Sequence, residues 1–279
     1  MGVASYLHTS MTTPPPTDGS IDFAILTALQ VEREAVCATF GLGEGARVKK
    51  GGRWYWRGRL ALKTGGAYEV VVAQPVDMGQ VEAAILASDV IRHWRPRAAL
   101  LVGIAASTDP EKAKLGDVVV AKSVWYYEHG KITPRGIKSQ PEMIPADAGL
   151  LKHFIGMVKW DGTVRTKRPD RKRSGSKVNV GVIASGEKVI ADAAVRNEID
   201  SGHRKILAIE MEGYGFSRAV WQSFERVRHL DIRGVCDDGS PTKDDDWHEY
   251  AAAAAAGFAK HFLMDGPLKP RTGLSEYPW

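Results

Sequence analysis

The chain has 279 residues, 44% of them hydrophobic, which suffices for one large α/β domain but not for two comfortable ones. Its net charge of +5 is concentrated in residues 167–177, which argues against a general nucleic-acid binder. Two distant cysteines, Cys37 and Cys236, support neither a disulfide framework nor a metal site, and no apolar run approaches the ~18 residues of a membrane span. We expect a cytoplasmic protein with no membrane contact, no nucleic-acid partner and no cofactor.

Residues 1–20 are polar and rich in proline, which predicts a flexible leader before a domain over 21–265 and an irregular tail over 266–279. Within the domain, strands are expected at 21–26, 53–57, 68–73, 98–102, 118–121, 178–184, 205–209 and 232–235. Helices are expected at 29–40, 80–94, 146–158, 213–221 and 247–263. This alternation predicts a mixed sheet with helices on both faces.

Two stretches lack a regular pattern. Residues 103–107 are small and predict a turn after a buried strand, where a ligand could approach the backbone closely. Residues 128–145 contain two glycines and three prolines without periodicity, which predicts an irregular excursion.

Acidic residues follow two of the expected strands. Glu210, Met211 and Glu212 come after the strand at 205–209, and Asp237 comes after the strand at 232–235. In an open α/β sheet, ligands bind at such strand ends, so the two segments predict one shared site. The alternative is that these acids only cap turns and helices.

Seven motifs in order resemble the nucleoside phosphorylase superfamily, closest to the methylthioadenosine/S-adenosylhomocysteine nucleosidases and to related bacterial effector domains that act on purine nucleotides. The motifs are Thr27–Glu32, Met78–Gly79, Val102–Ala106, Leu115–Asp117, Ser185–Gly186, Glu210–Glu212 and Arg233–Asp237. The resemblance spans nearly all of 21–263 and implies a three-layer α/β/α sandwich around a mixed, partly barrel-like sheet.

The resemblance also implies cleavage of the bond between a purine base and C1′ of its ribose. Asp237 matches the general acid that protonates the base, which at neutral pH requires burial to raise the pKa of the carboxyl. Glu212 matches the residue that binds the ribose hydroxyls, Met211 would pack beneath the sugar, and Glu32 would orient the attacking water. Further substrate contacts are expected from Glu210, Gly103, Ala105, Met78, Ser185, Lys188, Arg233 and Lys243.

Two other activities stay open. Arg33, beside Glu32, is compatible with a phosphate-dependent phosphorylase, although the phosphate loop of that class is absent from residues 27–32. A purine nucleotide sensor without catalysis is the second alternative. One departure from the family is Ser240, where relatives often carry a second aspartate.

The resemblance favours an adenine nucleotide such as ATP or AMP over a plain nucleoside as the substrate. It also suggests that the protein acts as an anti-phage defence effector. The 5′-phosphates would then be bound by the basic segment 165–177, or by Lys131, Arg135, Lys188 and Lys243. The alternative for the segment is a solvated loop, the usual explanation of a charge run. The resemblance further implies a homo-oligomer and a possible regulatory protein partner.

Overall fold

The computed structural model describes residues 21–134, 136–172, 174–240 and 245–271. The whole predicted leader (1–20), the end of the tail and the expected substrate contacts Arg135 and Lys243 lie outside these ranges. The strands are β1 (Phe23–Leu26), β2 (Arg47–Lys50), β3 (Arg53–Ala61), β4 (Ala67–Ala73), β5 (Ala98–Ser107), β6 (Val118–Tyr126), β7 (Gly130–Thr133), β8 (Gly136–Ser139), β9 (Glu142–Pro145), β10 (Val178–Ser185), β11 (Ile206–Glu210) and β12 (Arg228–Asp237). The helices are α1 (Gln30–Phe40), α2 (Gln80–Trp94), α3 (Ala148–Gly156), α4 (Ala193–Ser201), α5 (Gly213–Gln222) and α6 (His248–Met264), with a 3-10 turn at Glu44–Ala46.

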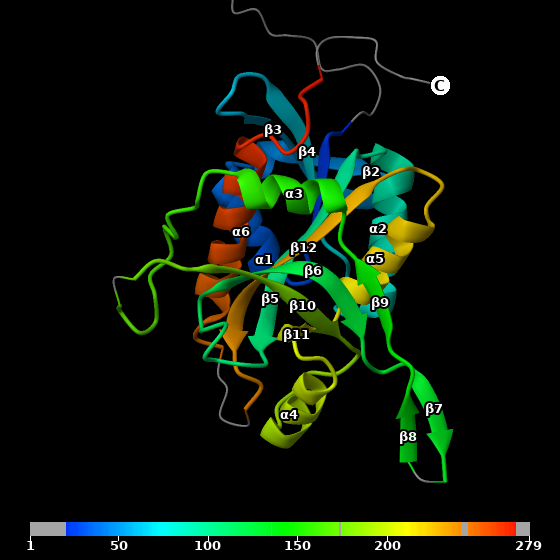
Figure 1. Ribbon diagram of the computed structural model, residues 1–279. Coiled ribbons are helices and arrows are strands. Elements are labelled where there is room, and N and C mark those ends of the chain that lie inside the picture. Colours follow the sequence, from blue (N-terminus) through cyan, green and yellow to red (C-terminus); the bar gives the residue numbers. More distant parts are fainter. Residues whose placement is uncertain (1–20, 135, 173, 241–244, 272–279) are drawn as a thin grey trace, which may run out of the picture.

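One mixed sheet forms the centre of the molecule, in the order β11-β10-β6-β12-β5-β1-β4-β3-β2, with β9 beside β6 (Figure 1). The start of β5 pairs with β1, and its last two residues pair with β11. The strands β5, β12, β6, β10 and β11 therefore close into a ring, and β1, β4, β3 and β2 extend from it as an open sheet. This confirms the predicted mixed, partly barrel-like sheet.

Two hydrophobic cores separate this sheet from its helices. Residues of α1, α3 and α6 pack with β1, β4, β5 and β12 in the larger core. Residues of α2 and α5 pack against the other side of β1, β4 and β5. The sheet thus lies between two helical layers, as predicted. The strands of the centre are buried on both faces, which explains their continuous apolar sequence. No described helix is both long and apolar enough to cross a membrane.

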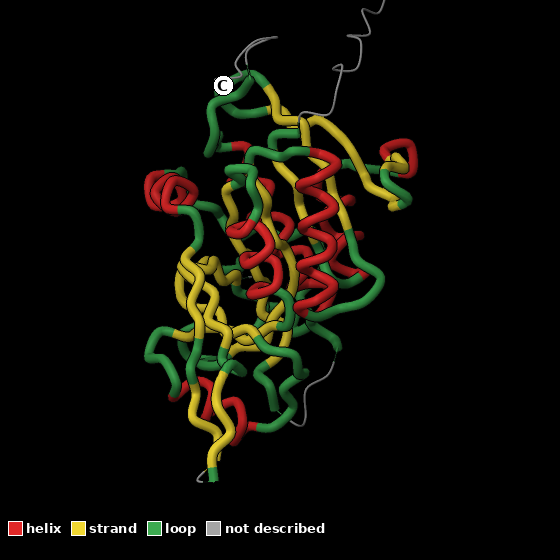
Figure 2. Tube along the Cα trace, turned by 90° about the vertical axis from the view of Figure 1, so that its right-hand side faces the viewer, coloured by secondary structure: helices red, strands yellow, loops and turns green. Residues whose placement is uncertain are grey.

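The structure corrects two expectations. The predicted turn at 103–107 continues β5, because its backbone is paired with β12 and β11. The predicted irregular segment 128–145 contains β9, which pairs with β6, and the β7–β8 hairpin, which projects from the body in both views (Figures 1 and 2). Pairing between strands creates these elements, so local sequence patterns did not reveal them. The strand β2 and the helix α4 were not predicted either.

Candidate active site

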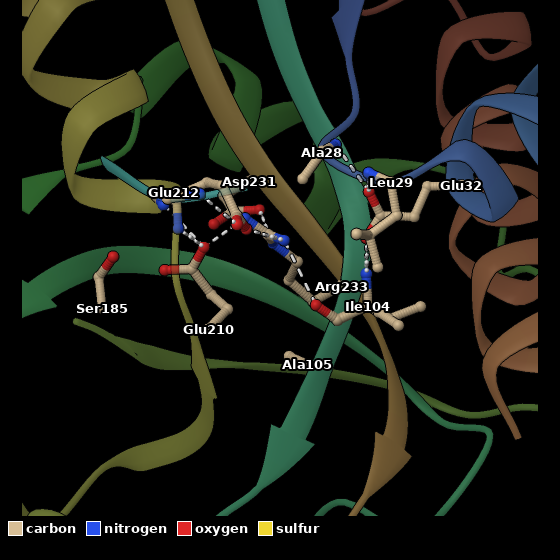
Figure 3. A network of polar contacts seen from close by, with 12 residues as sticks. Ala28, Leu29, Glu32, Ile104, Ala105, Ser185, Glu210, Glu212, Asp231 and Arg233 are labelled. Atoms are coloured by element: carbon tan, nitrogen blue, oxygen red, sulfur yellow. Dashed lines mark hydrogen bonds and ion pairs between the residues drawn. The ribbon is translucent and has the colours of Figure 1, made fainter. Parts of the chain in front are cut away.

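Four loops or strand ends bring acidic side chains to one place beside β5 (Figure 3). Glu32 comes from the first turn of α1, directly after β1. Glu210 ends β11, and Glu212 is the N-cap residue of α5. Arg233 lies within β12 between these acids (Figure 3). Glu210 and Glu212 of one acidic segment thus meet Arg233 of the other, whereas a place for Asp237 in the same site stays a prediction.

Glu32 is buried, and its carboxylate also caps the start of α1, where Leu29 is the N-cap residue. Its Oε2 accepts hydrogen bonds from the backbone N–H groups of Ala28 at 2.7 Å and Leu29 at 2.8 Å. Its Oε1 accepts from the N–H of Ile104 at 2.8 Å (Figure 3). These three donors hold the carboxylate between the β1–α1 loop and β5.

Gly103 is required where Glu32 reaches β5. A Cβ atom at this position would lie 2.4 Å from Oε1 of Glu32 and 2.8 Å from Nη1 of Arg233. Both separations are shorter than real Cβ contacts allow. The glycine in the motif at 102–106 thus permits a carboxylate and a guanidinium to pack directly against the strand.

Arg233 joins the acids of the site through one buried guanidinium. It donates from Nε to Asp231 at 2.8 Å, from Nη1 to Glu212 at 3.1 Å, and from Nη2 to Glu210. Nη1 also donates to the carbonyl of Ile104 at 3.3 Å. Such charge-assisted hydrogen bonds fix the planar group strongly, and with it the positions of the acids.

Burial changes the protonation of this cluster. It raises the pKa of Glu212 to about 7 and the pKa of Asp231 to about 8, against the opposing attraction of Arg233. Burial also raises the pKa of Glu32. The single guanidinium of Arg233 faces these three acids and Glu210. Repulsion between the carboxylates adds to the effect of burial on the pKa values of Glu212 and Asp231.

Asp237 lies at the end of β12 and is 9% exposed. Its Oδ1 accepts a hydrogen bond from the N–H of Gly239 at 2.7 Å, and its Oδ2 accepts from the thiol of Cys236 at 3.3 Å. Among the described residues, no lysine or arginine forms an ion pair with it. The hydrogen bond that Oδ2 accepts is thus from a weak thiol donor.

Other predicted contacts lie around this centre. Met78 is partly exposed in the β4–α2 loop, whose Gly79 donates its N–H to Glu212 at 3.2 Å. Met211, which directly precedes Glu212 in the chain, is half-buried, and Ala105 is buried in β5. Lys188 lies at the rim, where Glu128 accepts a hydrogen bond from it at 2.5 Å.

Three predicted contacts lie deeper. Ser185 and Arg233 are almost completely buried, as is the side chain of Glu210, and they form hydrogen bonds with protein groups. Ser185 Oγ accepts hydrogen bonds from Gln80 Nε2 at 2.8 Å and from the N–H of Tyr214 at 3.0 Å. Direct contact of these three with a substrate stays a prediction, and their described contacts place them as supports of the site.

Two supports were absent from the sequence analysis. Asp231 binds Arg233, and an acid inside an apolar strand, two residues before an arginine on the same face, was the available signal. Gln80 also accepts from the N–H of Gly215 at 2.6 Å and donates to the carbonyl of Gly186 at 2.9 Å. A polar residue at the first position of a helix is common, so its sequence carried no signal.

The basic segment 165–177 lies against the start of α6. Arg168 stacks over the rings of Trp247 and Tyr250, with its guanidinium carbon 5.0 Å and 5.2 Å from the ring centroids. It is also paired with Asp170 at 2.9 Å. This arginine is therefore held by protein contacts, and the binding of phosphates by the segment stays a prediction.

The fold and the acids gathered beside β5 define an α/β protein with a candidate active site at this place. A family model described as the phosphorylase superfamily matches residues 22–263, and the chain belongs to this family.

Comparison with individual proteins gives the same family. The chain is 31% identical over 274 residues to "ATP nucleosidase Cap17" of Escherichia coli strain KTE188, which covers 88% of this chain and 51% of that protein. It is 26% identical over 206 residues to "5'-methylthioadenosine/S-adenosylhomocysteine nucleosidase" of Staphylococcus haemolyticus, and the match covers 72% of this chain and 80% of that protein. The chain thus spans about half the length of Cap17.

A solved structure shares the fold. The S-adenosylhomocysteine nucleosidase of Streptococcus pyogenes, in complex with 5-methylthiotubericidin, superposes with a TM-score of 0.69 at 22% identity, covering 90% of this chain and 100% of that one.

Proposed function

We propose that the protein is a purine nucleosidase that hydrolyses the N-glycosidic bond of an adenine nucleotide or nucleoside and releases the free base. The observation that carries this proposal is the placement of Glu32 against β5, next to the Arg233 cluster that holds Glu212. The membership in the phosphorylase superfamily and the relatedness to two nucleosidases support it.

In this proposal Glu212 binds the sugar and Glu32 orients the attacking water molecule. A carboxylate has about four lone-pair sites, and Glu32 uses three of them on backbone N–H groups, which leaves one for a water molecule. Glu212 would accept hydrogen bonds from the ribose hydroxyls, with Met211 beneath the sugar. In the cleavage, the bond from C1′ to the base breaks while water oxygen bonds to C1′, and the sugar passes through a positively charged state that the carboxylates stabilise.

Asp237 is assigned to the leaving base. It would donate its proton to a ring nitrogen of the purine, so that the base leaves as a neutral molecule, and the proton lost by water restores the balance.

Hydrolysis is favoured over phosphorolysis by the position of Arg33. Its guanidinium stacks over Trp56 at 4.6 Å and is 3.0 Å from Glu34, so it is held at the surface of α1. The structure also gives no specific support to the alternative of a sensor without catalysis.

The test is incubation with ATP, AMP, adenosine and methylthioadenosine, with and without phosphate, followed by chromatography of the products. We expect adenine without a need for phosphate, and loss of most turnover in Glu32→Gln and Glu212→Gln, while the surface control Glu34→Gln keeps it. Strict dependence on phosphate, with ribose 1-phosphate as product, would establish phosphorolysis instead. Absence of base release from every substrate would support a sensor.

We propose an ATP-type substrate because a relative that covers 88% of this chain is named an ATP nucleosidase. A role as a defence effector and a regulatory protein partner stay predictions. A homo-oligomer is supported by exposed apolar residues on and beside α2 and α5, namely Val76, Val81, Ile85, Trp221 and Phe224.

A further inference from the structure

β12 ends in a β-bulge next to the proposed general acid. Val235 lies opposite Ala105 and Asp237 lies opposite Ala106, so Cys236 is the extra residue in its strand. In a regular strand, consecutive side chains point to opposite faces, and a bulge can turn two of them toward the same side. Here it brings the thiol sulfur of Cys236 within 3.3 Å of Oδ2 of Asp237.

His248 completes a cluster of three different ligand types. It is the first residue of α6, and its imidazole, the Cys236 sulfur and an Asp237 oxygen all lie within 4.8 Å of one another. Its Nε2 lies 3.4 Å from Oδ1 of the exposed Asp245, which adds negative charge at the rim. Cys236 and Asp237 are buried while His248 is half-buried, so an ion could enter from the side of α6.

We propose that Cys236, Asp237 and His248 form a binding site for Zn²⁺, and that an ion bound there switches the enzyme off. Thiolate and imidazole are preferred zinc ligands, and three protein ligands leave the fourth tetrahedral position to water. Zinc bonds of about 2.0–2.3 Å would set the ligand atoms roughly 3.3–3.8 Å apart, so the cluster needs only a small closure of its side chains.

Binding has a defined proton balance. Zn²⁺ bonds to the Cys236 sulfur and releases the thiol proton to solvent, while Asp237 coordinates as the carboxylate. A carboxylate bound to zinc has no proton to give to a leaving base. The inhibitory part of the proposal therefore rests on the proposed function, whereas the binding part does not.

Binding is tested on the full chain, without substrate, by titration with ZnCl₂ and separately with CoCl₂. We expect one zinc ion per chain and, with cobalt, the absorption band of a thiolate-to-cobalt charge transfer. His248→Gln should weaken binding by more than roughly 100-fold, because groups that merely orient a metal ligand are already worth about 10–100-fold. Cys236→Ala should abolish the charge-transfer band.

Matched controls separate this site from adventitious metal binding. Cys37→Ala alters the other buried cysteine, and His203→Gln alters another half-buried histidine. Both should keep the affinity and the cobalt band of the unaltered protein. Zinc binding that is absent, or that persists in His248→Gln and Cys236→Ala, would overturn the proposal. Because His248→Gln changes a half-buried side chain, it also keeps the test valid if Cys236→Ala does not fold.

Inhibition is tested by measuring base release over a range of free zinc set with a chelator. We expect activity to fall with zinc, to return on chelation, and to resist zinc in His248→Gln relative to the activity of that variant without metal. Stoichiometric zinc binding at this cluster with undiminished activity would overturn the switch. A chain that binds zinc as expected but cleaves none of the substrates would refute the proposed function and leave the metal site established.

Discussion

Arg233 determines the positions of the acidic side chains around it. It is almost completely buried and donates to Asp231, Glu210 and Glu212. Removal of one partner of such a buried pair leaves an uncompensated charge and costs several kcal/mol, typically about 3–5. Its own contacts are with protein groups, so Arg233 serves the site by placing Glu212 and by lying beside Glu32.

At Asp237, we expect the effect of substitution to depend on the leaving group. Asp237→Asn should slow cleavage of a purine substrate by ~10²–10⁴-fold, the usual contribution of general acid catalysis. A 4-nitrophenyl riboside, whose leaving group needs no proton, should lose far less. The measurement is the ratio of kcat/KM values on the two substrates. Equal losses in a variant of unchanged thermal stability would show that Asp237 is not the acid.

At Asp231, we expect a pH-dependent effect on stability. The pKa of this carboxyl is raised to about 8 from 3.8, so the folded chain binds its proton more tightly than the unfolded chain. The free energy of unfolding should therefore fall as the pH rises between these values. Oδ2 of Asp231 and Oε1 of Glu210 face the same space beside Gly213 without a described partner, which suits a proton held by Asp231 between them.

Asp231→Asn removes this titration and should make the decline of Tm between about pH 5 and about pH 8 shallower. Glu212, with a pKa of about 7, would contribute the remaining decline. Thermal unfolding of the ligand-free protein across this range measures the slope, with Asp89→Asn as the control at a half-buried ion pair with Arg53. A slope in Asp231→Asn equal to that of the unaltered protein would contradict the assignment.

Among the elements, α6 depends on small side chains. Its buried alanines, such as Ala254 and Ala255, pack in the core that contains Val102 of β5 and Ile232 of β12. Small residues let the helix approach the sheet closely, and this approach also places His248 at the end of β12. The helix thus connects the packing of the core with the edge of the site.

We expect Ala255→Leu to destabilise the protein by about 1–3 kcal/mol, the usual cost of adding volume to a packed core. Ala253→Leu is the matched control, since Ala253 is half-buried and lines a surface cavity of about 590 Å³. Urea unfolding measures both variants. An equal effect of the two substitutions would show that α6 is packed no more tightly against the sheet than on its outer side.

For the whole molecule, we propose that the outer face of α2 and α5 is where chains associate. Val81 of α2 shares a hollow of about 350 Å³ with Arg218 and Gln222 of α5, and Trp221 beside it is 63% exposed. Exposed apolar residues gathered in this way are typical of protein interfaces.

If this face joins two copies of the chain, Trp221→Glu should convert the oligomer to a monomer. Gln222→Glu adds the same charge at the neighbouring residue and should leave the association less affected. Light scattering after gel filtration measures the mass of each variant. A monomeric unaltered protein, or an oligomer insensitive to Trp221→Glu, would contradict the proposed interface.

Much of the fold follows from local sequence. Apolar runs predicted β1, β5, β11 and β12, and helical periodicity predicted α1, α2, α5 and α6, because each pattern lies within one element. The motifs also named Glu32, Glu212 and Asp237 in advance, since residues at strand ends converge in an α/β sheet. Their catalytic roles stay predictions.

Contacts between distant segments could be seen only in three dimensions. Strand pairing turned residues 103–107 into the end of β5 and closed the ring with β11. Packing of Arg233 against Asp231 of its own strand, Glu210 at the end of β11 and Glu212 at the start of α5 made one buried ion cluster. The raised pKa values of Glu212 and Asp231 follow from that burial. The approach of His248 to Cys236 and Asp237 likewise depends on the bulge in β12 and on the packing of α6. Neither feature can be predicted from the sequence alone.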